Sequence, residues 1–204
     1  SAAEAAYLNR AFDATLSLNL RSPEAEAWIE KYAASEIKYI DATSKQAIKQ
    51  IILKSFQEGI TSKEQAKLIK PYIGLTPRQA TALENYTARL VEQDISSAMI
   101  DKLTETYSNK LLDQRAWNIA ITEGHTASNE GFRAQNADAV ERGILVPEKY
   151  ERAWLVTDDD RLCDDCADLE DARADLPDGT FEGGGGNGPP LHNLCRCTEE
   201  VVRI

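Results

Sequence analysis

The chain has 204 residues and carries 34 acidic and 23 basic side chains, which gives a formal net charge of −11. Hydrophobic residues make up 42% and charged residues 28%, a composition typical of folded globular proteins rather than disordered or fibrous ones. This length is sufficient for one large or two small domains with a buried core. No stretch approaches about 18 consecutive apolar residues, so the sequence predicts no membrane-spanning helix and no membrane partner.

The first 59 residues are predicted to form three helices. Apolar residues at spacings of three and four predict a first helix over residues 1–20. Ser22-Pro23 combines a cap residue with a proline at the first helical position, and predicts a second helix that runs to about Ile40. A third helix is expected to start at Ser44 and to stop at Gly59.

Helical patterns continue up to residue 143. A short helix is expected after Ser62, with its end at Pro71, and Thr76-Pro77 repeats the cap-proline signal at the start of a longer one. The next helical run covers residues 97–143, and we expect it to break near residue 108 and again near Gly124.

The composition changes after residue 143. A β-branched and aromatic run over residues 153–157 predicts a strand, and residues 198–204 predict a second one. Between them, the glycine-rich stretch 183–188 offers nothing to a core and is expected to be a mobile loop.

All four cysteines and one of the two histidines lie between residues 163 and 197, as C-x₂-C followed by H-x₂-C-x-C. A two-residue gap lets one turn direct two ligands at a tetrahedral ion, and two such turns can hold a zinc ion from opposite sides. The preferred ligands are Cys163, Cys166, His192 and Cys195, with Cys197 as an alternative fourth ligand in place of Cys195. Two disulfides or four free buried thiols remain as alternatives.

Four protein ligands leave no position for water or substrate, so such a zinc ion would be structural and its binding would stabilise the fold. The fold class that follows is a mainly α-helical N-terminal domain, residues 1–143, and a small zinc-stabilised α+β C-terminal domain with short antiparallel strands, residues 144–204.

Several catalytic metal signatures are absent. Neither histidine starts the His-x-Glu of zinc deaminases or the H-E-x-x-H of zinc peptidases. The acidic run that begins at Asp158 lacks the glycine and the glutamate that an EF-hand loop requires at its sixth and twelfth positions. No catalytic residue is therefore predicted, and no small-molecule substrate. The alternative is a metal-dependent nuclease or hydrolase that uses Glu123, His125 or the cluster Asp158–Asp160.

Charge restricts binding to nucleic acid. Residues 151–204 hold 14 acidic and 5 basic side chains, too few cations to displace counterions from phosphates. A weak DNA-contacting face is an alternative only for the helical half. Six lysines are spread over residues 45–70 there: Lys45, Lys49, Lys54, Lys63, Lys67 and Lys70.

A set of motifs over residues 74–204 resembles the phage Mu protein F-like family of minor head, or head-morphogenesis, proteins. The matching residues are Gly74-Leu75-Thr76-Pro77-Arg78-Gln79, Arg115-Ala116, Ile119-Ala120, Thr122-Glu123, Asn129, Trp154, Val156-Thr157, Asp159, Cys163, Cys166, Pro189-Pro190, His192 and Cys195-Arg196-Cys197. The final Pro-Pro-x-His-x-x-Cys-Arg-Cys is the most specific part. Ile121 departs from the family pattern, which has an arginine there.

The resemblance implies a non-enzymatic protein that docks to phage portal and capsid proteins during head assembly, stays in the virion, and assists DNA packaging or ejection in some members. It also implies a packing role for Cys195 and Cys197, because the family keeps Cys-Arg-Cys where the other ligands are missing. The same domain occurs fused to toxin enzymes, so a delivery module without its enzyme partner is a further alternative.

Overall fold

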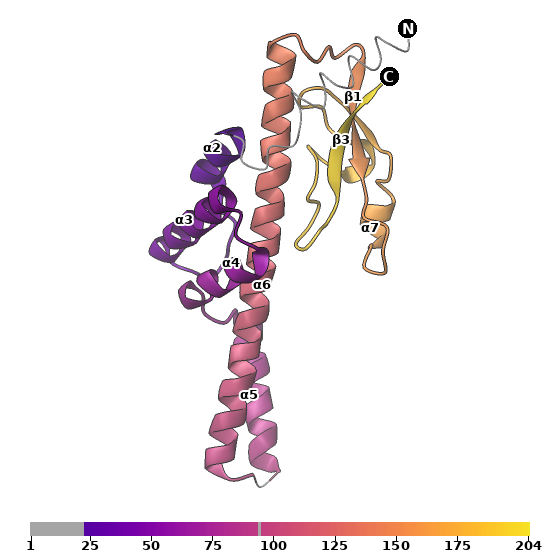
Figure 1. The fold of residues 1–204 in the computed structure, drawn as a ribbon. Helices are drawn as coiled ribbons and strands as arrows, with labels where there is room; N and C mark the ends of the chain where they lie inside the picture. Colours follow the sequence, from indigo (N-terminus) through magenta and orange to yellow (C-terminus); the bar gives the residue numbers. More distant parts are fainter. Residues whose placement is uncertain (1–22, 94) are drawn as a thin grey trace. The chain divides into compact units, whose positions relative to one another are not determined.

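The computed structural model describes residues 23–93 and 95–204, and the helix expected over residues 1–20 lies outside them, as does Ser22. The chain is mostly helical and ends in a small antiparallel sheet (Figure 1). It forms two compact units, Tyr32–Gly124 and His125–Ile204, and the second unit includes the described residues up to Lys31.

The unit 32–124 begins with helices α3 (Ala42–Glu58) and α4 (Ser62–Ile69), followed by the 3₁₀ turn η1 (Lys70–Tyr72). Helix α3 starts before the predicted Ser44, because Asp41 accepts a hydrogen bond from the Ser44 N–H at 2.8 Å and caps the helix. Its end at Gly59 is confirmed. The two helices bury isoleucines in a common core: Ile48, Ile52 and Ile69.

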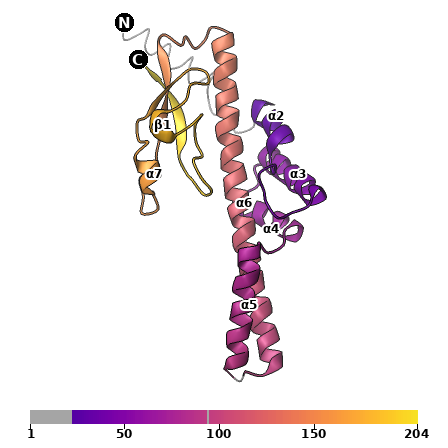
Figure 2. The ribbon, with the colours of Figure 1, turned by 180° about the vertical axis from the view of Figure 1, so that it is seen from behind.

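Helices α5 (Pro77–Glu92) and α6 (Ser97–Glu141) are consecutive and pack as an antiparallel hairpin over the first part of α6 (Figure 2). The predicted start of α5 is confirmed, since Thr76 and Gln79 form a capping box. Within the hairpin, the rings of Tyr86 and Tyr107 have their centroids 4.7 Å apart.

The predicted end of the second helix is wrong, and so are the two breaks predicted within residues 97–143. Helix α2 (Pro23–Tyr32) ends well before Ile40, because Ala34 takes a left-handed conformation with φ of 65°. The Ala34 N–H is bonded to Glu123 instead of a helical carbonyl, so a tertiary contact determines the end of this helix. The breaks expected near residue 108 and Gly124 are also absent, since α6 is continuous. A single interior glycine costs a helix only about 1 kcal/mol, which packing easily offsets.

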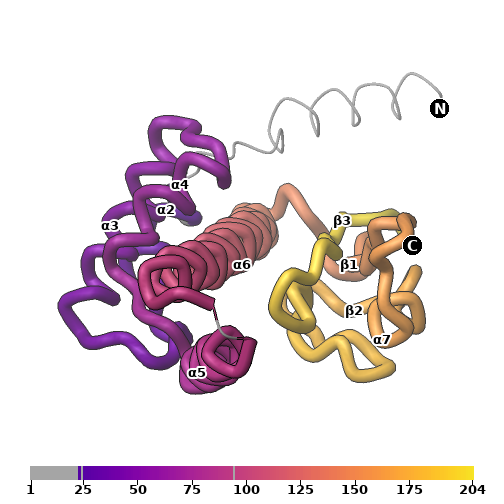
Figure 3. The backbone as a smooth tube through the Cα atoms, turned by 90° about the horizontal axis from the view of Figure 1, so that it is seen from below, coloured from indigo at the N-terminus to yellow at the C-terminus, as the bar shows by residue number. Residues whose placement is uncertain are grey.

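The sheet has the order β2–β1–β3, with β1 (Tyr150–Leu155) in the centre, β2 (Arg173–Asp175) on one side and β3 (Thr198–Arg203) on the other (Figure 3). Both pairings are antiparallel, and Arg152 of β1 faces Ala174 and Val201. The predicted strands are confirmed with shifted ends. A one-turn helix, α7 (Asp164–Ala167), and a 3₁₀ turn, η2 (Glu182–Gly184), complete this segment.

The glycine-rich loop was expected to be mobile, and the structure instead folds it against the core of the sheet. The Phe181 N–H donates to the Gly186 carbonyl at 2.7 Å, which closes the loop on itself. The Phe181 ring is buried and packs edge-on against Trp154, with centroids 5.3 Å apart. Phe181, which lies two residues before the glycine-rich stretch, therefore connects the loop to the core.

Substitution of Gly131 by alanine is expected to destabilise the second unit. A Cβ at this position of α6 would lie 2.4 Å from the Ala25 Cβ and 3.0 Å from the Ala25 Cα of α2, so the two helices would have to separate. Overpacking of this kind costs about 1–3 kcal/mol, against a gain of about 1 kcal/mol in helix propensity. Urea unfolding followed by circular dichroism measures the difference.

Gly124→Ala is the matched control for that experiment. It lies in the same helix, but its added Cβ would meet only Gln65 Oε1, at 3.9 Å. Gly124→Ala should therefore be neutral or stabilising. Equal stability of the two variants would contradict close packing between α2 and α6.

Candidate metal centre

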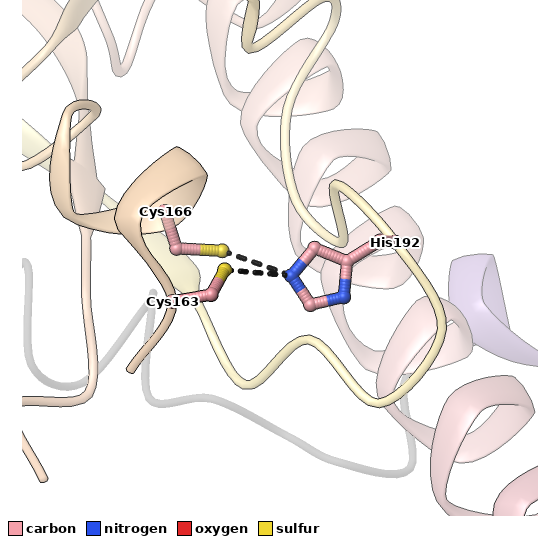
Figure 4. A group of neighbouring side chains, drawn as sticks. All are labelled: Cys163, Cys166 and His192. Carbon is pink, nitrogen blue, oxygen red and sulfur yellow. Dashed lines mark hydrogen bonds between the residues drawn. The ribbon is translucent and has the colours of Figure 1, made fainter. Parts of the chain in front are cut away.

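The one-turn helix α7 holds the first pair of cysteines. Cys163 is its N-cap residue and Cys166 lies inside it, so both sulfurs emerge from one turn of backbone. His192 and Cys195 belong to the loop that leads into β3. Figure 4 shows both α7 sulfurs directed at the same ring nitrogen of His192.

The distances in this cluster suit a common ion. His192 Nε2 lies 3.2 Å from Cys163 Sγ and 3.3 Å from Cys166 Sγ, and Cys166 Sγ lies 3.8 Å from Cys195 Sγ. Tetrahedral zinc, with bonds of about 2.3 Å to sulfur and about 2.0–2.1 Å to nitrogen, separates two sulfurs by about 3.8 Å and a sulfur from a nitrogen by about 3.6 Å. The sulfur–sulfur distance agrees, and the two sulfur–nitrogen distances are a few tenths of an ångström shorter.

The five predicted donors form two overlapping groups that share Cys166. One group is Cys163, Cys166 and His192, and the other is Cys166, Cys195 and Cys197, with the donor atoms of each within 4.8 Å of one another. Either group could hold a metal ion. All four cysteines are free, so the alternative of two disulfides is not what the structure contains.

The His192 ring is oriented by a hydrogen bond on its far side. Its Nδ1 lies 2.9 Å from the Asn193 carbonyl oxygen, which can only accept, so Nδ1 carries the proton. That tautomer leaves the Nε2 lone pair free toward the two sulfurs. Metal-binding histidines are commonly oriented in this way by a backbone carbonyl.

Backbone N–H groups point at two of the sulfurs. The Cys166 N–H lowers the pKa of the Cys163 thiol. Burial raises the pKa of Cys195, but hydrogen bonds from the backbone of Cys197 and Leu191 outweigh it, and the net pKa is lowered. Both residues are thus prepared for the thiolate form that binds metal.

The net pKa shift of the other two cysteines has the opposite direction. Burial raises the pKa of both Cys166 and Cys197, each of which has only 2% of its surface exposed. A buried thiol surrounded by other sulfurs loses its proton readily only when a cation takes the proton's place. The cavity between these side chains has a volume of about 20 Å³, enough for one ion.

Three of the alternative catalytic groups, Glu123, His125 and Asp159, have structural partners. Glu123 Oε2 accepts the Ala34 N–H at 2.9 Å, and His125 Nε2 donates to the Cys197 carbonyl at 2.6 Å. Asp159 accepts from both terminal nitrogens of Arg196, which hold its pKa well below the usual range, while Asp158 and Asp160 are exposed.

Glu123→Gln is expected to change how stability depends on pH. Burial raises the pKa of Glu123, so its stabilising contribution is complete below its unfolded pKa, near 4.5, and is lost as the pH rises through the folded pKa. Glutamine keeps the bond from Ala34 without ionising. The difference in melting temperature, variant minus wild type, should therefore increase between pH 4 and pH 8. A difference that stays constant over this range would contradict the raised pKa of Glu123.

Several of the six lysines of the candidate DNA face make contacts within the unit 32–124. Lys45 donates to the Ser35 carbonyl at 2.6 Å, and Lys70 Nζ lies 2.7 Å from Asp113. Lys54 pairs with Glu58 at 4.0 Å. Lys63 and Lys67 are exposed.

Sequence reasoning named Asn129 only as a motif residue and missed the buried Arg152 and Glu199 near the centre. Asn129 of α6 donates to the His125 carbonyl at 3.2 Å and accepts from the Thr198 hydroxyl at 2.9 Å, next to the last cysteine. Arg152 and Glu199 are buried as an ion pair, with 2.7 Å between Arg152 Nη2 and Glu199 Oε2. Only the position of Arg152 two residues before Trp154, on the same strand face, gave a signal for its burial.

Comparison of the chain with protein-family models, with curated protein sequences and with solved structures gives no match. None of the helices in residues 23–93 and 95–204 has the combination of length and apolar composition needed to cross a bilayer.

Proposed function

We propose that Cys163, Cys166, His192 and Cys195 bind one structural zinc ion that stabilises the C-terminal fold. Three thiolates and one imidazole are a donor set that zinc prefers. The distance of 3.8 Å between Cys166 Sγ and Cys195 Sγ supports Cys195 as the fourth ligand. When bound, the ion supplies folding free energy and not chemistry, because four protein ligands leave it no open position.

The protein as a whole is, in this proposal, a non-enzymatic minor head protein that docks to a phage portal and capsid and remains in the virion. One observation carries this: the motif residues behind the family resemblance are engaged in holding the fold. Arg115 is buried and donates to the Lys38 carbonyl at 2.6 Å and also to that of Gly74. Thr157 donates to the Arg196 carbonyl at 2.9 Å.

Several other motif residues outside the metal centre are also engaged in internal contacts. Glu123 and Asn129 bond backbone or side-chain groups of neighbouring segments, Trp154 fills the core, and Asp159 binds Arg196. Catalytic motifs instead bring side chains to a common cleft. Motif residues used for internal contacts support a scaffold that presents a surface to partners.

Co-expression with the portal protein of a phage that encodes this chain tests the docking role. The chain should co-sediment with assembled portal in a density gradient, and a Cys163→Ser/Cys166→Ser variant should remain in the light fractions. Asp165→Ser, an exposed substitution in the same turn, is the control and should behave as the wild type. A wild-type chain that sediments apart from the portal would overturn the docking role. That result would not contradict the proposed metal centre.

A further inference from the structure

A buried cluster of charged side chains lies between α6, β1 and β3. Arg152 donates to Glu199 Oε2 from Nη2 at 2.7 Å and from Nε at 3.3 Å, and both side chains are fully buried. Arg133 of α6 adds a second guanidinium, with its Nε 3.6 Å from the other carboxylate oxygen of Glu199. Arg133, Arg152 and Glu199 are called the charge cluster below.

The charge cluster holds the backbone just before His192. Arg133 Nη2 donates to the Pro189 carbonyl at 2.9 Å, and both guanidiniums donate to the Asn187 carbonyl. Gly188, between them, has a φ of +139°, and a Cβ there would lie 2.8 Å from Glu199 Oε2. Only glycine fits this conformation and this space. Residues 187–189 are therefore fixed against the charge cluster.

This position matters for the metal ligands. Pro189 precedes His192 by three residues, and Glu199 follows Cys197 by two, so the charge cluster holds both ends of the segment that carries His192, Cys195 and Cys197. A tetrahedral ion uses four donors, while the chain offers five. His192 is exposed on its loop, whereas Cys197 is buried beside Cys166 and Cys195. Whether the nitrogen or the extra sulfur binds depends on where the loop is held.

We propose that Arg133 and Arg152 are positioning residues that place His192, rather than Cys197, in the ligand set. Their contacts with Asn187, Pro189 and Glu199 keep the His192 ring against Cys163 and Cys166. Without them the loop relaxes and Cys197 completes a set of four thiolates. This inference rests on the metal centre of the proposed function.

Arg133→Met tests the inference, with Co²⁺ as the probe, because the thiolate-to-cobalt absorption grows with the number of bound thiolates. Arg133 is the better site for substitution because 16% of its side chain is exposed, so the fully buried pair of Arg152 and Glu199 is kept. The wild type should show three thiolates and one nitrogen, and Arg133→Met should show four thiolates. Arg142→Met, at an exposed pair with Asp138, is the control and should keep the wild-type spectrum.

A second variant also removes the alternative donor, Cys197. Arg133→Met/Cys197→Ser lacks both the anchored loop and the extra thiolate, so its affinity for Co²⁺ and Zn²⁺ should fall by about 10–100-fold, as is usual when a ligand loses its supporting residues. The fall is measured against Cys197→Ser alone, which keeps the anchored loop.

The failures are distinguishable. An Arg133→Met protein with an unchanged spectrum and affinity would overturn the positioning role and leave the metal centre intact. A wild-type four-thiolate spectrum that survives His192→Ala would overturn the positioning role and would also remove His192 from the proposed ligand set. A wild-type chain that binds neither Co²⁺ nor Zn²⁺ would overturn both this inference and the proposed zinc site.

Discussion

Replacement of Cys163 by serine is expected to abolish tight zinc binding and to unfold the segment from β1 to β3. The core of this segment is small: it consists mainly of Trp154, Phe181, Leu169 and the cysteines themselves. Zinc-finger peptides gain about 10–16 kcal/mol from zinc at neutral pH, which is comparable to the whole stability of an ordinary domain, about 5–15 kcal/mol. Loss of the ion should therefore remove most of the stability of this segment.

Helix content should change little in the same variant, because α3, α4 and α5 belong to the unit 32–124. Far-UV circular dichroism, together with tryptophan fluorescence for the buried Trp154, separates the two effects. Asp165→Ser should show neither change. A complete collapse of the helical signal in Cys163→Ser would contradict the independence of the two units.

Arg152→Met is expected to destabilise the sheet by about 3–5 kcal/mol, because it leaves the Glu199 carboxylate buried without its main partner. It also removes the donor to the Gly179 carbonyl, 3.0 Å away, and a donor to the Asn187 carbonyl of the glycine-rich loop. Denaturant unfolding of the zinc-loaded protein measures the loss. Arg173→Met on the neighbouring strand, whose pair with Glu151 is partly exposed, should cost less than about 1 kcal/mol.

A double variant distinguishes the ion pair from the loop contacts. Arg152→Met/Glu199→Leu removes both charges, so the penalty for an unpaired carboxylate disappears. Recovery of most of the lost stability would assign the effect to the ion pair. No recovery would assign it to the carbonyls of the loop, and a wild-type stability in Arg152→Met itself would show that the pair is not needed.

Local signals in the sequence predicted the start of α5 and the cysteine cluster correctly. Thr76-Pro77 begins α5 because a cap and an N1 proline act within one turn of backbone. Cys163 and Cys166 lie on one turn because a two-residue gap makes a turn by itself. Such features depend on neighbours in the sequence, and they can be predicted without knowledge of the rest of the fold.

The missed features depend on contacts between distant segments. The end of α2 follows from the bond between Ala34 and Glu123, which are 89 residues apart. Arg152 and Glu199 are charged residues that pattern reasoning places on the surface, and only their mutual pairing across β1 and β3 allows burial. The glycine-rich loop is ordered by the same pair, so its order could not be predicted from its composition.

Metal content and thiol state, measured together on the purified chain by native mass spectrometry, test the central claim most directly. The account predicts one zinc ion per chain, with all four cysteines recovered as thiols after the zinc is removed under denaturing conditions. A metal-free folded chain whose mass is lower by the hydrogens of two disulfides would contradict it.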